Sequence, residues 1–125
     1  MKVLILIGVG GGIGAICRFL LSRSVQLIFP FAFPLGTLVV NILGSFLIGF
    51  LSVLILTRFG AFGAELRALL LIGLLGGFTT FSSFSLEAME LWENGAEIKL
   101  IFYLLFSVAL SLFAAYGGLI LGRKI

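Results

Sequence analysis

The sequence contains no histidine, a single cysteine, two prolines and few charged residues. The absence of histidine removes the commonest proton shuttle and metal ligand. One cysteine, Cys17, cannot form a disulfide within the chain. Only 10% of the 125 residues are charged, against about a quarter in a typical globular domain. This composition excludes an ordinary soluble domain, and the length leaves no room for a separate soluble catalytic domain, so an enzyme is not expected.

Apolar residues dominate instead, at 62% of the chain with a mean hydropathy of +1.35. They form four blocks, each near the roughly 20 residues that span the hydrocarbon core of a bilayer. The predicted spans are residues 3–21, 35–57, 66–92 and 98–121. Short connectors make consecutive spans antiparallel neighbours. We therefore expect an all-α, multi-pass membrane protein, with residues 1–125 forming one four-helix domain in the cell membrane, the bacterial cytoplasmic (inner) membrane.

The net charge of +3 comes from basic residues scattered at the ends of the apolar blocks, which is typical of membrane insertion and not of nucleic-acid binding. The side with the two termini carries the larger share of them. This bias favours cytoplasmic termini, and insertion in both orientations remains open. The two sets are Lys2, Arg58, Arg67, Arg123 and Lys124 on that side, and Arg23 and Lys99 on the other.

The third block contains the segment Gly-Gly-Phe-Thr-Thr-Phe-Ser-Ser-Phe-Ser at residues 76–85. Paired glycines and clustered hydroxyls weaken a helix at bilayer depth. Irregular backbone there is tolerated only where it is buried in protein or lines a wet cavity. Transporters use such interruptions to direct freed carbonyl groups at an ion. The segment therefore predicts a broken third helix and a function in ion handling.

Polar side chains also occur at depth in the second and fourth spans. Asn41 needs a hydrogen-bond partner, because an unpaired amide would cost on the order of 2–7 kcal/mol in an apolar medium. It is therefore either a hydrogen-bonding link between helices or an N–H donor in an anion path. Tyr103, Ser107 and Ser111 recur every four residues, so they share one helix face. We expect this polar ribbon to face another helix or a narrow pore.

Two phenylalanines and two charged residues are further candidates. Phe81 and Phe84 lie three residues apart inside the interruption, and the positive edge of an aromatic ring can contact an anion, although such pairs are more often packing. Arg18 is interpreted equally as an anion-attracting group at a pore mouth or as a side chain that snorkels to the membrane surface. Glu87 is expected to form a structural hydrogen bond or ion pair.

Small residues repeat at four-residue spacing in every span, which allows close helix packing in lipid. This packing is either internal to one bundle or between subunits, and their number favours homo-oligomerisation. The pairs are Gly8 and Gly12, Gly10 and Gly14, Ser45 and Gly49, Gly73 and Gly77, and Gly118 and Gly122.

Residues 76–85, Asn41 in the segment 35–46, and Arg18 in the segment 14–19 together resemble the Fluc fluoride-channel family, also called CrcB-type proteins. The resemblance covers the whole chain in length, number of spans and order of motifs. It implies an antiparallel, dual-topology homodimer with two fluoride pores along the subunit interface. It also implies passive export of fluoride down its electrochemical gradient.

By that resemblance, Phe81, Phe84 and Asn41 would line the pore, and Arg18 is a further candidate pore residue. The candidates for a track of hydroxyl groups are Ser83, Tyr103, Ser107 and Ser111. The backbone carbonyls of Gly76 and Thr79 from both subunits would hold a structural sodium ion on the two-fold axis, since such an axis supplies matching ligands from both chains. Gly76 is expected to be the point at which the chain leaves helical geometry.

Two other classes of protein fit parts of the sequence. A small proton-coupled multidrug exporter has a similar size but needs a membrane-embedded carboxylate, and the first, second and fourth spans contain none. A non-transporting assembly protein would explain the glycine packing but not polar residues beside an interrupted helix.

Overall fold

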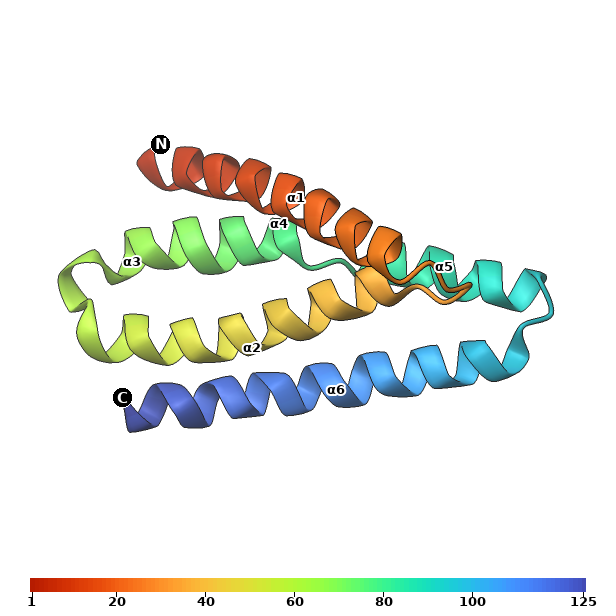
Figure 1. The fold of residues 1–125 in the computed structure, drawn as a ribbon. Coiled ribbons are helices and arrows are strands. Elements are labelled where there is room, and N and C mark those ends of the chain that lie inside the picture. The colour runs from red at the N-terminus through yellow and green to blue at the C-terminus, as the bar shows by residue number, and fades with distance from the viewer.

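The computed structural model describes residues 1–125 as four long helical segments that run up and down in an antiparallel bundle (Figure 1). Three segments are continuous helices: α1 (Lys2–Ile28), α2 (Leu35–Arg58) and α6 (Glu97–Lys124). The third segment is composite and consists of η1 (Gly60–Phe62), α3 (Gly63–Leu66), η2 (Arg67–Leu75), α4 (Gly76–Phe78) and α5 (Phe81–Glu93). All four are long and apolar enough to cross a membrane, which confirms the all-helical, four-span architecture.

The first helix continues beyond the predicted span to Ile28. Arg23 lies within it, since arginine is a good helix former, and its exposed guanidinium lies over the ring of Phe19, 5.8 Å from the centroid. The helix stops just before Pro30, as expected from the steric restriction that proline places on its predecessor. Gln26 then fixes the connecting loop by donating a 2.9 Å hydrogen bond to the carbonyl oxygen of Phe31.

The segment η2 is a π-helix of nine residues, far longer than the single-turn π-bulges that occur within most α-helices. It packs along α1 and leads directly into α4. The apolar pattern of this stretch predicts a helix but carries no signal for the wider turn.

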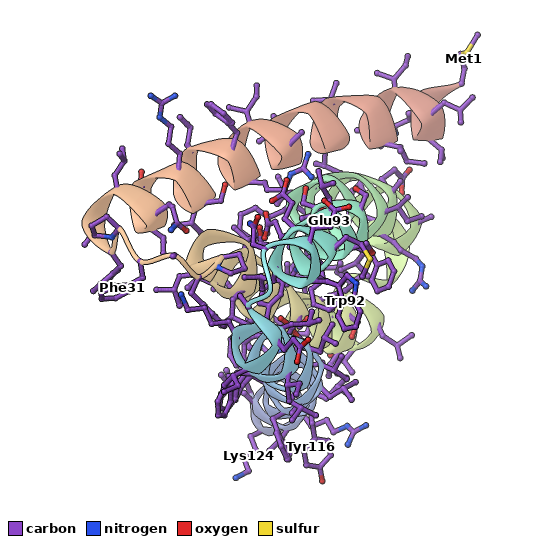
Figure 2. The ribbon with its side chains drawn as sticks, turned by 90° about the vertical axis from the view of Figure 1, so that its right-hand side faces the viewer. Met1, Phe31, Trp92, Glu93, Tyr116 and Lys124 are labelled. Atoms are coloured by element: carbon purple, nitrogen blue, oxygen red, sulfur yellow. The ribbon has the colours of Figure 1, made fainter.

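The helices form two closely packed pairs, α1 with η2 and α4, and α2 with α6. Viewed along the bundle, α1 and α6 lie on opposite sides (Figure 2). Glycines make both pairings possible. A Cβ atom added to Gly14 of α1 would overlap the carbonyl oxygen of Leu74, and one added to Gly49 of α2 would overlap that of Ala115. Much of the small-residue pattern therefore serves packing within one chain.

Only 23 of the 125 residues are buried, so most apolar side chains face outward. An apolar exterior of this extent requires cover by lipid or by another protein chain. The largest buried cluster lies where α2, α5 and α6 meet and consists of Leu38, Phe84, Ala88, Leu91, Leu100 and Tyr103. This cluster fixes the position of α5 beside the interruption in the third segment.

Candidate functional site

The interruption consists of two residues with extended backbone between α4 and α5. Thr79 has φ −81° and ψ 158°, and Thr80 has φ −151° and ψ 121°. Gly76, by contrast, has helical angles of φ −61° and ψ −38°. The prediction that the chain leaves helical geometry at Gly76 was wrong, because the departure comes three residues later, at Thr79.

Side chains replace the helical hydrogen bonds that the interruption removes. The N–H of Thr80 donates to Oδ1 of Asn41 at 2.8 Å, and the N–H of Ser83 donates to Oγ1 of Thr80 at 3.1 Å. In a continuous helix these two N–H groups would donate to the carbonyls of Gly76 and Thr79, respectively. The carbonyl oxygens of Gly76 and Thr79 therefore lack the N–H donors that a continuous helix would provide.

Asn41 braces the interruption from the neighbouring helix α2. In addition to accepting from the Thr80 N–H, its Nδ2 donates to the Thr80 carbonyl oxygen at 2.9 Å. The side chain thus pairs with both polar groups of one residue, which lipid could not satisfy. An asparagine amide has two N–H protons, and only one has an acceptor within the chain. Asn41 therefore combines the structural link with a spare donor.

A cavity of about 360 Å³ lies beside this brace, and we call it the serine cavity. Its wall includes Ser107 and Ser111 of α6, whose Oγ atoms are buried and have no hydrogen-bond partner in the chain. Buried hydroxyls are normally hydrogen-bonded, so we expect the serine cavity to hold a polar group or ion that pairs with these two hydroxyls. The lining residues are Asn41, Gly44, Ser45, Ile48, Thr79, Thr80, Phe81, Phe84, Ser107, Val108, Ser111 and Leu112.

The two predicted phenylalanines meet at the wall of the serine cavity but differ in burial. Their ring centroids are 5.5 Å apart, at an interplanar angle of 49°. Phe84 is 9% exposed and packs 5.1 Å from the ring of Tyr103, whereas Phe81 is 79% exposed. Phe84 is therefore fixed by the core, and Phe81 lies on an outer face of the single chain.

A second cavity of about 260 Å³, here named the arginine cavity, is also lined by Thr80. Arg18 and Ser83 line this cavity and not the serine cavity, although Thr80 lines both. Arg18 is half-buried and has no hydrogen bond or ion pair within the chain. The complete lining is Arg18, Phe19, Ser22, Thr37, Thr80, Ser83 and Glu87.

The arginine cavity adjoins a wider depression of about 510 Å³ at the end of the bundle that carries the α1–α2 loop. The two share Phe19, Ser22, Thr37 and Glu87 in their linings. The depression, the arginine cavity and the serine cavity thus form a series in which neighbouring spaces share lining residues. This series includes all the predicted pore side chains except Tyr103.

Tyr103 has a different partner from the two serines on its face of α6. It is fully buried, and its hydroxyl donates to Oε2 of Glu87 at 2.8 Å. Thr37 donates to Oε1 of the same carboxylate at 2.7 Å. The Thr37–Glu87–Tyr103 network joins α2, α5 and α6, and it confirms the prediction that Glu87 forms a structural hydrogen bond. The role of Thr37 was missed, and its only signal was a hydroxyl at depth in an apolar span.

Comparison with known proteins identifies the family. The sequence model of one family, described as "CrcB-like protein, Camphor Resistance (CrcB)", matches residues 5–119. The chain belongs to the CrcB family. The resemblance proposed from residues 76–85, Asn41 and Arg18 is thereby confirmed.

Individual relatives of this CrcB-family chain carry the name "Fluoride-specific ion channel FluC". The protein from Agrobacterium fabrum is 50% identical over 121 residues, which cover 96% of this chain and 95% of the relative. The Rhizobium meliloti protein is 46% identical over 124 residues, 98% of each chain. The Aquifex aeolicus protein is 42% identical over 125 residues, and both chains are covered completely. With its four spans, the chain is a multi-pass protein of the cell membrane.

Proposed function

We propose that this chain is a fluoride-selective ion channel that exports fluoride passively down its electrochemical gradient. The names of the relatives support the substrate and the class of protein, a channel and not an enzyme. The observation that carries the proposal for this chain is the serine cavity. There, the unpartnered hydroxyls of Ser107 and Ser111 line the same space as the amide of Asn41 and the ring of Phe84.

The chemistry of the serine cavity suits a small, strongly hydrated anion. Hydroxyl and amide donors replace the water that fluoride leaves behind, and the edges of Phe81 and Phe84 add weakly positive C–H groups. No charged side chain lines this cavity. Neutral donors bind the ion without a fixed countercharge that would trap it, and conduction requires binding that still permits exit.

The proposed assembly is an antiparallel, dual-topology homodimer with two pores. Phe81 is 79% exposed in the single chain, and the lining residues Val108 and Leu112 belong to an exposed apolar face of α6. A second copy on this face would enclose the serine cavity and give Phe81 a packing partner. Two-fold symmetry would then produce one equivalent pore for each subunit.

A structural sodium ion at the dimer centre is part of the same proposal. The residues that fit it are Gly76 and Thr79, whose carbonyls have lost the N–H donors of Thr80 and Ser83. Two such carbonyls from each subunit supply four hard oxygen ligands, which suit a small hard cation. Gly76 is exposed in the single chain, so a partner's backbone can approach it closely.

The functional test is ion flux from liposomes that contain the purified protein. We expect rapid fluoride efflux under a potassium gradient with ionophore, and little chloride efflux, measured with ion-selective electrodes. Equal rates for the two halides would contradict the proposed selectivity. A requirement for a proton gradient would favour the multidrug exporter, which the family membership and the hydrogen-bonded state of both Glu87 oxygens disfavour. Absence of any flux would favour the assembly protein.

The unpartnered hydroxyls make a second prediction. The double variant S107A/S111A should reduce fluoride flux by tenfold or more, since a hydrogen bond to a charged group contributes about 1.5–3 kcal/mol and about 1.4 kcal/mol corresponds to a factor of ten. Ser85→Ala is the matched control, because its hydroxyl donates to the carbonyl of Phe81 in its own helix. If S107A/S111A conducts fluoride at the same rate as Ser85→Ala and the wild type, the serine cavity is not the ion path.

A further inference from the structure

One end of the bundle carries a cluster of positively charged residues that do not line the proposed pore. The N-terminus, the connection from α2 to α3, and the C-terminus all lie at this end (Figure 1). Its only acidic side chain, Glu65, pairs with Lys2 at 3.4 Å. We call this the basic end, and its cationic residues are Lys2, Arg58, Arg67, Arg123 and Lys124.

A cleft of about 200 Å³ opens at the basic end between α2, α3 and η2. One wall is apolar and includes Ile55, which is buried, and Leu56, which is 83% exposed. The opposite side contains Gly60, where an added Cβ atom would meet no other atom within 4 Å, so the cleft is open there. The complete lining is Ser52, Ile55, Leu56, Gly60, Gly63, Ala64 and Arg67.

Arg67 is the charged residue of the cleft, and its guanidinium has no partner within the chain. The acidic neighbour Glu65 is already paired with Lys2, and Arg58 instead donates to the carbonyl oxygen of Ile125. All five N–H donors of Arg67 are therefore available to a ligand. A guanidinium matches phosphate oxygens in a two-pronged geometry.

We infer that this cleft binds the headgroup of an anionic phospholipid, with the lipid phosphate on Arg67 and its apolar portion against Ile55 and Leu56. The cleft combines a free guanidinium, an exposed apolar wall and a position at the end of membrane-spanning helices. Basic pockets between such helices are typical sites for anionic headgroups. A soluble phosphate has no apolar part for this wall, and a choline headgroup would bring a positive charge to the basic end.

The test compares lipid binding by purified wild-type protein and three variants, using native mass spectrometry and melting temperature in detergent. The probes are phosphatidylglycerol, phosphatidylcholine and inorganic phosphate. Phosphatidylglycerol should bind more tightly than phosphatidylcholine and raise the melting temperature. Arg67→Gln should weaken this binding by about fivefold. Ala64→Leu, which keeps the charge but fills the cleft, should weaken it similarly.

Arg123→Gln is the matched control, because it removes the same charge at the basic end but outside the cleft. It should weaken phosphatidylglycerol binding clearly less than Arg67→Gln does. Equal losses in the two variants would show diffuse surface attraction and overturn the site. An unchanged affinity in Arg67→Gln would also overturn it. Equal protection by inorganic phosphate would overturn the assignment to a lipid.

Discussion

Asn41→Asp is expected to abolish fluoride flux in a protein that still folds and assembles. An ionised carboxylate in the serine cavity repels an anion. At a separation of 4 Å and an effective dielectric constant of 20, the repulsion is about 4 kcal/mol. An energy of this size corresponds to about a thousandfold loss of occupancy.

A second effect of Asn41→Asp does not depend on charge. Asn41 uses one amide proton on the carbonyl of Thr80 and has a second proton without an acceptor in the chain. A protonated aspartic acid can restore the pairing with Thr80, but it has no further proton to donate. Flux should therefore fall in either protonation state, for two separate physical reasons.

The measurement is fluoride efflux from liposomes, together with melting temperature and oligomeric state for each variant. Asn94→Asp is the comparison variant, since it makes the same chemical change at the exposed C-terminal end of α5, where it lines the wider depression and not the serine cavity and where water and salt screen the added charge. It should conduct close to the wild-type rate. Wild-type flux in Asn41→Asp would leave Asn41 with only its structural role at Thr80.

The helical architecture and the cluster around the serine cavity followed from local patterns in the sequence. Four apolar blocks of membrane-spanning length are enough to predict four helices. Ser107 and Ser111 share a face because they lie four residues apart, and Asn41 is one of few polar residues at depth. Such patterns depend on one helix at a time, which is why they could be recognised without knowledge of the packing.

Partners on different helices could not be predicted in this way. Tyr103 has the same spacing as the two serines, yet its longer side chain reaches Glu87, and it does not line the serine cavity. Thr37 meets Glu87 across 50 positions of sequence, which only the packing of α2 against α5 decides. The position of the interruption is a similar case. Gly76 has the greatest backbone freedom, but the pairing with Asn41 selects Thr80.

Gly76→Val is expected to prevent dimer formation while the single chain remains folded. Within one chain, a Cβ atom added to Gly76 meets only the carbonyl oxygen of Leu71, at an ordinary contact distance of 3.8 Å. The residue is exposed and helical, so valine fits the local geometry. In the proposed dimer, however, the backbone at Gly76 faces its partner across the two-fold axis. Two added side chains would hold the carbonyls apart and remove the sodium site.

The measurement is the dimer fraction in lipid or mild detergent, recorded in sodium and again after exchange for potassium. Wild-type dimer should melt at a higher temperature in sodium, because an ion bound only by the assembled state stabilises it.

Gly76→Val should be monomeric, and replacing sodium by potassium should not change its melting temperature. Gly60→Val is the matched control, since Gly60 is also exposed, an added Cβ atom there meets no atom within 4 Å, and the residue lies in the α2–α3 connection, outside the small-residue pairs. Dimers of normal stability in Gly76→Val would place the interruption away from the two-fold axis and refute the carbonyl site. Equal loss in both variants would point to a general effect of added bulk on exposed glycines. A loss confined to Gly76, with sodium dependence in the wild type alone, is expected because Gly76 combines an exposed backbone with a carbonyl that lacks its helical donor beside the interruption.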